Sequence, residues 1–170
     1  MRILGISASA SIFSSNYHLL KAVQRLRQDK DEMQVFEGLQ DFDLFSPSRL
    51  TAGIPKNILE LKQKIDAAEL IIIATPEYTH NIPAVLKNLI EWCTASGEFA
   101  QKNVLPITFT PYEPRGAHAM TSLLQSLQTM KAKIETQLPL YKTDVEIKEN
   151  QIELPAEVVA LLNTAIDLYR

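Results

Sequence analysis

The chain has 170 residues, with 17 basic and 20 acidic side chains and a formal net charge of −3. This length is typical of a single domain, here residues 1–170, whose core needs no covalent staples. Charges of both signs are scattered along the chain, which excludes the continuous positive surface that nucleic acids require. Cys93 is the only cysteine, so an internal disulfide is excluded and a reducing compartment, the cytoplasm, is expected.

The apolar segments are too short to cross a bilayer. The longest run, Leu70 to Ala74, is far below the roughly 20 residues that a spanning helix needs. The amino-terminal MRILGISASA leads straight into a serine-rich turn and lacks a full signal-peptide core, so it is interpreted as a strand. We therefore expect a soluble protein without a membrane partner.

Short apolar runs alternate with segments of helical periodicity, which is typical of a parallel sheet with helices on both faces. The predicted strands are 2–6, 33–36, 70–74 and 104–110, and the predicted helices are 15–28, 58–68, 83–93, 120–130 and 155–166. Turn-forming residues and two prolines predict a long connection over 41–55. A fifth strand is expected within 133–152, without a defined position.

Pro106 conflicts with this topology. It lies inside the strand predicted over 104–110. Proline has no backbone N–H, so it removes one hydrogen bond from the ladder of a central strand. The alternation of elements nevertheless favours a strand here.

Ligands of an open parallel sheet bind beyond the carboxyl ends of the strands, where two loops are of interest. The first is SASASIFSSN, residues 7–16, with five serines and one asparagine directly before a helix. Free N–H groups at a helix amino terminus and serine hydroxyls can bind a phosphate without an arginine. A capped helix behind a polar surface loop is the alternative, and serine content alone favours it.

The second loop is TPEYTHNIP, residues 75–83, which follows the most apolar predicted strand. Pro76 and Pro83 stiffen it. Tyr78 offers an aromatic face, and the backbone of 77–80 can meet the polar edge of a heterocycle. A surface tyrosine and a solvated His80 are the alternatives.

Both loops resemble one family. ISASASIFSSN is similar to the ISGSxRxxSxN signature of the NADPH-dependent FMN reductases, and TPEYTHNIPAVLKNLIEW to their TPEYNxSxPGxLKNxIDW. The resemblance weakens beyond about Ile134. It implies a flavodoxin-like α/β fold, a five-stranded parallel sheet of order 2-1-3-4-5 between helices. It also implies an NAD(P)H-dependent FMN or quinone reductase, which passes electrons from NADPH or NADH through FMN to a flavin, quinone, azo compound or metal oxyanion.

The resemblance carries over a set of cofactor-binding residues. Ser9, Ser14 and Asn16, with Ser11 beside them, would hold the FMN phosphate, and Pro76, Glu77, Tyr78 and Thr79 would line the isoalloxazine ring. No side chain is assigned a catalytic role, because the flavin carries the chemistry.

Arg115 and Gly116, in the turn TPYEPRG, complete the predicted site. Arg115 is interpreted as the one cation on a ligand-facing loop, where its fork suits a phosphate of the nicotinamide nucleotide. A surface ion pair with Glu113 is the equally weighted alternative. Gly116 permits close approach of the backbone.

Several positions depart from the family pattern. Ala8, Ser11, Thr79, Asn81 and Ala84 stand where the family prefers glycine, arginine, asparagine, serine and glycine. The serine at position 11 removes a bidentate phosphate partner, which leaves weaker flavin binding or a less strict choice of NADPH open. It also gives weight to an electron carrier or a non-catalytic flavin-binding module, although a carrier is usually more acidic.

Other motifs carry less. Glu37, Asp41 and Asp43 lack histidine partners and are interpreted as a solvated acidic rim, not a metal site. GxSxG, GxGxxG and P-loop motifs are absent from the sequence, which argues against a hydrolase elbow and against Rossmann or P-loop binding. Cys93 falls on an apolar helical stripe and is expected to be a buried structural thiol.

The helix that begins near Pro83 is expected to form an interface between copies of the chain. Its apolar stripe consists of Val85, Leu86, Leu89 and Ile90. Trp92 lies off this stripe, and a large exposed aromatic commonly marks an interface. We therefore predict a homodimer or homotetramer, in line with the dimers that the resemblance implies. A Trp92 folded over its own domain is the alternative.

Overall fold

The computed structural model describes residues 1–11 and 14–170. In these residues the helices and strands are β1 (Arg2–Ser7), α1 (Ser15–Arg27), β2 (Glu32–Phe36), η1 (Leu39–Asp41), α2 (Pro47–Ala52), α3 (Lys56–Ala67), β3 (Leu70–Thr75), α4 (Ala84–Thr94), β4 (Asn103–Thr110), α5 (Ala117–Thr129), β5 (Leu138–Tyr141), η2 (Lys142–Asp144), β6 (Glu146–Lys148), β7 (Gln151–Glu153) and α6 (Ala156–Asp167).

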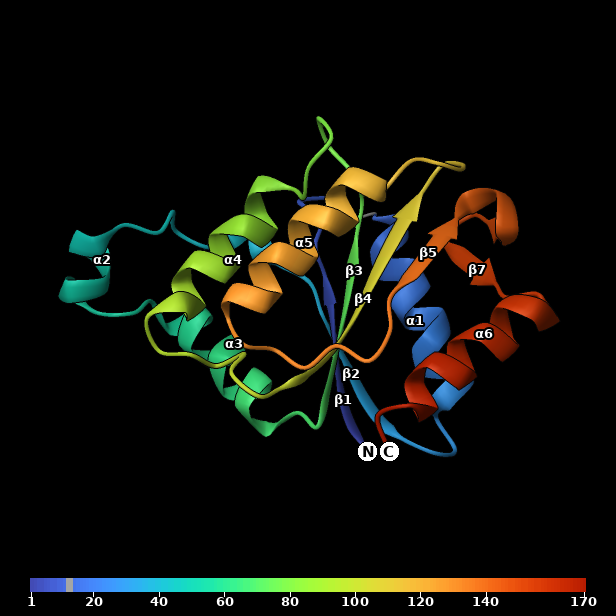
Figure 1. Ribbon diagram of the computed structural model, residues 1–170, viewed down its shortest axis with the longest axis horizontal. Coiled ribbons are helices and arrows are strands. Elements are labelled where there is room, and N and C mark those ends of the chain that lie inside the picture. The colour runs from blue at the N-terminus through green and yellow to red at the C-terminus, as the bar shows by residue number, and fades with distance from the viewer. Residues whose placement is uncertain (12–13) are drawn as a thin grey trace.

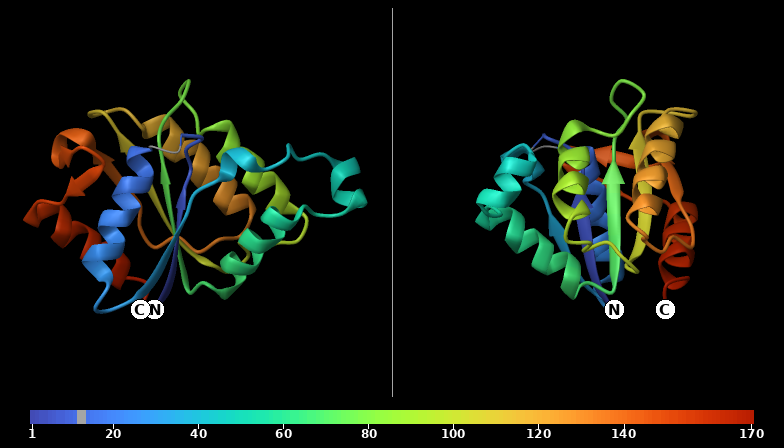
Figure 2. Two further views of the ribbon diagram at one scale, coloured as in Figure 1. Left: turned by 180° about the vertical axis from the view of Figure 1, so that it is seen from behind. Right: turned by 60° about the vertical axis from the view of Figure 1, so that its left-hand side comes forward.

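Five parallel strands form one sheet in the order β2-β1-β3-β4-β5, which confirms the predicted topology. Helices α3, α4 and α5 pack on one face and α1 and α6 on the other (Figures 1 and 2). In β3, Ile71 and Ile73 face the first group of helices, while Ile72 and Ala74 face the second. Burial on both faces explains why this strand is apolar throughout.

Pro106 is tolerated because it faces a gap beside β4. Alternate residues of a parallel strand direct their backbone groups to the same neighbour. Val104, two residues earlier, donates its N–H to the Lys133 carbonyl at 2.8 Å, on the β5 side. Pairing with β5 begins only at Ile107. The N–H that proline lacks would point toward β5 at a position where β5 has not yet begun. Pro106 therefore removes no hydrogen bond between β4 and β5.

The hydroxyl of Tyr169 fills part of this gap. It donates to the Val104 carbonyl at 2.8 Å and accepts the N–H of Glu135 at 3.1 Å. Burial of this side chain raises the pKa of Tyr169. Tyr169, near the carboxyl end of the chain, thus links β4 to the segment that leads into β5. Each of these hydrogen bonds contributes about 0.5–1.5 kcal/mol to stability.

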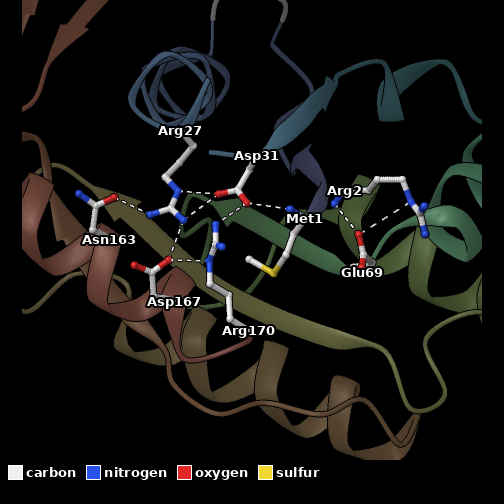
Figure 3. A network of polar contacts seen from close by, with 8 residues as sticks. All are labelled: Met1, Arg2, Arg27, Asp31, Glu69, Asn163, Asp167 and Arg170. Atoms are coloured by element: carbon white, nitrogen blue, oxygen red, sulfur yellow. Dashed lines mark hydrogen bonds and ion pairs between the residues drawn. The ribbon is translucent and has the colours of Figure 1, made fainter. Parts of the chain in front are cut away.

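Ion pairs of the buried Arg27 join α1 to the end of α6 (Figure 3). The guanidinium of Arg27 is fully buried and lies 2.7 Å from carboxylate oxygens of both Asp31 and Asp167. Burial alone would raise the pKa of Asp31, but hydrogen bonds from the amino group of Met1 and from Arg27 outweigh it and lower this pKa. The two ends of the chain therefore lie side by side at the amino-terminal edge of the sheet.

The predicted long connection over 41–55 is not irregular throughout, because it contains all of α2 and the last residue of η1. Helix α2 sits on an arm that projects from the body (Figure 1, left). The Ser46 hydroxyl accepts the Arg49 N–H at 3.2 Å and so caps the helix. The fifth strand is β5, and a two-stranded hairpin of β6 and β7 follows it.

The prediction of an exposed Trp92 was wrong. Its side chain is 0% exposed. The indole N–H donates to the Asp43 carbonyl at 2.8 Å, and the ring meets Phe45 edge to face with centroids 5.3 Å apart. The connection between η1 and α2 covers this part of α4. The periodicity of the helix alone does not show whether a distant segment covers this face. Trp92 therefore belongs to the domain core and offers no surface to a partner.

Candidate functional site

The carboxyl ends of β1, β3 and β4 meet at one edge of the sheet. Ser7 pairs with Ala74, and Thr75 pairs with Thr108, so the three following loops leave the sheet at a similar level. Figure 1 shows these loops together at the top of the view. This is the edge at which a parallel α/β sheet binds its ligands.

Two adjoining cavities open between the loops. The first, here called the serine-loop cavity, has a volume of about 380 Å³ and is lined by Ser9, Ser11, Ser14, Ser15, Asn16, Pro76, Glu77, Tyr78, Phe109, Thr110, Pro111, Arg115 and Lys142. The second, the outer cavity, has a volume of about 500 Å³ and is lined by Glu77, Tyr78, Thr79, His80, Thr110, Pro111 and Arg115.

Eight of the ten residues predicted to bind cofactors line the serine-loop cavity: Ser9, Ser11, Ser14, Asn16, Pro76, Glu77, Tyr78 and Arg115. Thr79 lines only the outer cavity, and Gly116 lines neither. Gly116 instead shapes the backbone, with φ at 101° at the start of α5. A Cβ here would lie 3.0 Å from Oγ1 of Thr108, so other residues do not fit. Cofactor binding by these residues stays a prediction.

The serine loop offers buried polar groups to its cavity. Ser14 caps α1, and its Oγ accepts the Asn16 N–H at 3.2 Å, so its own hydroxyl proton remains available. The Ser9 Oγ accepts the Ser11 N–H at 3.2 Å. Asn16 is 2% exposed, yet its Oδ1 has no hydrogen-bond partner among the described residues. Ile12 and Phe13, also in this loop, lie outside the described residues.

A buried amide oxygen without a partner costs about 1–3 kcal/mol, so Asn16 Oδ1 indicates a position suited to a ligand. The amide can rotate by half a turn and present its N–H donors instead of its oxygen. Donors from Asn16, Ser14 and the first turn of α1 match the acceptor oxygens of a phosphate monoester. These residues therefore fit the phosphate end of FMN.

The loop after β3 ends in a tight hairpin turn. Tyr78 and Asn81 exchange both backbone hydrogen bonds at 2.9 Å. The two residues between them, Thr79 and His80, have φ of 52° and 56°. A β-branched residue rarely adopts this conformation, and such strain costs of order 1–3 kcal/mol and gathers at functional sites. The turn leaves Tyr78 51% exposed at the boundary of both cavities.

Glu77 connects this loop to α5. The N–H groups of His118 and Ala119 donate to its Oε2, each at 3.0 Å, and its Oε1 lies 3.6 Å from Nδ1 of His80. Burial alone would raise the pKa of Glu77, but hydrogen bonds from the backbone of α5 outweigh it and lower this pKa. The carboxylate is thus engaged at the helix amino terminus, and the backbone of Glu77 is left for a ligand.

The cations of the site differ from the prediction. Arg115 was expected to be the only one, but Lys142 of η2 lines the same cavity. Sequence reasoning missed Lys142 because the fifth strand was not placed. Its one signal is the apolar LPLY directly before the lysine. The guanidinium carbon of Arg115 lies 5.4 Å from the Tyr112 ring centroid, and among the described residues Arg115 makes no ion pair with Glu113.

Other candidate chemistry finds no support in the described part of the chain. Residues 1–11 and 14–170 contain no group of three histidine, cysteine or acidic side chains arranged for a metal ion. Cys93 is buried as expected, and burial raises the pKa of its thiol far above the ordinary value. In the same ranges, no helix has the length and apolar character to cross a bilayer.

Comparisons with solved structures define the class of the fold. FerB, a flavoenzyme NAD(P)H:(acceptor) oxidoreductase from Paracoccus denitrificans, superposes with a TM-score of 0.83 and 20% identity, covering 99% of this chain and 94% of that chain. A flavodoxin from the domain Archaea superposes with a TM-score of 0.63 and 11% identity, covering 99% and 96%. The fold is therefore flavodoxin-like.

The sequence comparisons define the family. The profile of the NADPH-dependent FMN reductases matches residues 1–138, and the chain belongs to this family. The NADH:(hydroxy)cinnamate reductase subunit CrdA of Vibrio ruber is 36% identical over 98 residues, 58% of this chain and 48% of that protein. NADH-dependent flavin reductase subunit 2 of Lactobacillus johnsonii is 35% identical over 103 residues, 61% and 52%. The chain thus spans about half the length of these relatives.

The Glu77 contacts predict a pH-dependent contribution to stability. Glu77→Gln removes the charge at the start of α5 and should lower the free energy of unfolding by about 1 kcal/mol at pH 7. Because the folded pKa is lowered, this contribution is present above about pH 4.3, the unfolded pKa, and is lost as pH falls through the folded pKa.

Urea unfolding of both proteins at pH 7 and in acid measures the difference. It should shrink toward zero in acid. Glu91→Gln is the control, because the pair of Glu91 with Lys87 is exposed and its loss should change stability little at either pH. Equal stability of Glu77→Gln and the parent protein at pH 7 would contradict the role of Glu77.

Proposed function

We propose that the protein binds FMN in the serine-loop cavity and passes electrons from NADPH or NADH to a small acceptor. The observation that carries this proposal is the buried Asn16 beside Ser9 and Ser14, in one cavity with Tyr78. Its Oδ1 has no hydrogen-bond partner among residues 1–11 and 14–170. Membership of the FMN reductase family supports it.

Each wall of the site has a separate task. Ser9, Ser11, Ser14 and Asn16 would hold the phosphate, and Pro76, Tyr78, Thr79 and the backbone of Glu77 would line the ring. FMN, when bound, supplies hydride acceptance from the nicotinamide and transfer of electrons to the acceptor. The chain binds and orients the reactants, so no catalytic side chain is needed.

The outer cavity supports a broad class of acceptors. It is open to solvent at Tyr78 and His80, both exposed, and it adjoins the serine-loop cavity. An acceptor can therefore approach the proposed ring position from outside without a fitted pocket. Flavins, quinones, azo compounds and metal oxyanions can all accept electrons from a ring that they approach in this way.

The proposal extends to the whole chain. We infer a single cytoplasmic domain, residues 1–170, that forms a homodimer or homotetramer. Trp92 is buried and no longer supports an interface. A groove of about 530 Å³ between α4 and α5 supports one instead, and its lining includes the exposed Thr94 and Thr129. Two relatives are named as subunits.

The assembly is expected to be visible in solution. Sedimentation equilibrium at micromolar concentration should give a multiple of the 19.1 kDa chain mass. Thr129→Asp should shift the equilibrium toward the monomer, because it places a charge at an exposed position of the groove wall. A parent protein that sediments as a monomer at this concentration would exclude the proposed dimer.

FMN should bind more tightly than riboflavin, because only FMN carries the phosphate. The double variant Ser14→Ala with Asn16→Ala should lose about 1–3 kcal/mol of FMN binding and leave riboflavin binding unchanged. Quenching of flavin fluorescence measures both affinities. If riboflavin binds to the parent protein as tightly as FMN, the phosphate role of this loop is wrong.

Anaerobic reduction of the FMN-loaded protein distinguishes a reductase from an electron carrier. Anaerobic addition of NADPH or NADH should bleach the visible band of the bound flavin. A flavin that stays oxidised with both nucleotides, yet is bleached by dithionite, would indicate a carrier or a binding module instead.

Arg115 is proposed to contact the nicotinamide nucleotide, with the 2′-phosphate of NADPH as its partner. Arg115→Ala should then raise the KM for NADPH, a loss of roughly 1.5–3 kcal/mol, and leave NADH nearly unchanged. Arg49→Ala, on the projecting α2 arm, is the control. Steady-state kinetics with equal effects on both nucleotides would remove Arg115 from this role.

A further inference from the structure

The two cations of the site occupy different positions. Arg115 borders both cavities, whereas Lys142 borders only the serine-loop cavity. Lys142 opens η2, directly after β5. The hairpin that follows packs against α1, where Arg25 donates to the Ile152 carbonyl at 3.2 Å. The fold therefore brings the segment after β5 to the side of the sheet that carries the serine loop.

Lys142 has no partner within the described protein. Its ammonium makes no hydrogen bond or ion pair with residues 1–11 or 14–170. The nearest acid on its own turn, Asp144, instead accepts the Tyr141 N–H at 3.1 Å and the Thr143 hydroxyl at 3.3 Å. Lys148 in the hairpin, by contrast, is paired with carboxylates. Lys142 is thus a lysine at the cavity wall whose charge has no partner in the part of the chain that the structure describes.

The serine loop offers hydrogen bonds to this cavity but no charge. Ser9, Ser14 and Asn16 are buried and neutral, and position 11 holds a serine. A phosphate monoester carries close to two negative charges at neutral pH. Hydrogen bonds to a charged acceptor are strengthened by a nearby cation, and neutral donors alone leave most of that charge uncompensated.

We propose that Lys142 supplies the cation of the phosphate subsite and so selects the phosphorylated flavin over riboflavin, an inference that rests on the proposed function. A lysine is a compact charge on a flexible stem, so it can neutralise a phosphate in the cavity without the fixed geometry of an arginine. Because the side chain is exposed, its attraction for the phosphate is screened by salt.

The test is a pair of fluorescence titrations, one with FMN and one with riboflavin, on the apoprotein. Lys142→Gln should raise the Kd for FMN on the order of tenfold and leave riboflavin unchanged. Lys142→Arg should retain most of the FMN affinity. Lys30→Gln, in the turn that follows the far end of α1, changes the net charge equally and should change neither Kd. Added salt should weaken FMN binding more in the parent protein than in Lys142→Gln.

The outcomes separate this inference from the proposal beneath it. If the parent protein binds FMN no better than riboflavin, the phosphate subsite and the role of Lys142 both fall. If the parent protein prefers FMN and Lys142→Gln keeps that preference, only the role of Lys142 is overturned. An equal loss for both flavins with an unchanged circular dichroism spectrum also overturns it, because the lysine then acts on the ring or on the shape of the cavity.

Discussion

Burial of β3 on both faces is the constraint on which the rest of the site depends. All six residues of Leu70–Thr75 are buried, and each isoleucine contributes roughly 1.5–3 kcal/mol by leaving water. The strand pairs with β1 on one side and β4 on the other, in a fixed register. A slip of one residue would exchange the two faces and expose the core. The register therefore fixes the positions of the loops after these three strands, so that all three lie at the same edge of the sheet.

Charge at this edge is divided between structure and ligand. The carboxylate of Glu77 accepts hydrogen bonds from backbone N–H groups at the start of α5, which compensate its negative charge. Arg115 and Lys142 make no ion pair within the described residues and remain available. A chain with a net charge of −3 thus has a ligand edge suited to anions. Such an edge matches the phosphate groups of flavin and nicotinamide nucleotides.

Most of the fold was predictable because its signals are local. The run from Leu70 to Ala74 and the helical stripes identify strands and helices by period alone, and the serine loop follows a strand in the chain. Trp92 was mispredicted because helical periodicity does not report which distant segment covers a helix. The tolerance of Pro106 depends on where β5 begins, which the sequence does not show.

Lys142 was missed for a related reason. The strand before it has only four residues, and one of them is Pro139, so the apolar run is too short and irregular to be identified as a strand. Without β5, no argument places the following lysine at the carboxyl edge of the sheet. The predicted residues that line the cavities lie in loops next to long, strongly patterned strands. Lys142 follows a short strand without such a pattern.

Hydrogen exchange of the protein with and without FMN tests most directly whether the ligand edge is where the cofactor binds. We expect FMN to slow amide exchange in residues 14–18, 77–82 and 112–119. No change is expected in the groove of about 400 Å³ at the opposite end of the sheet, which Arg2, Glu32 and Lys64 help to line. Protection of that groove, with unchanged exchange at the three loops, would contradict the assignment of the site.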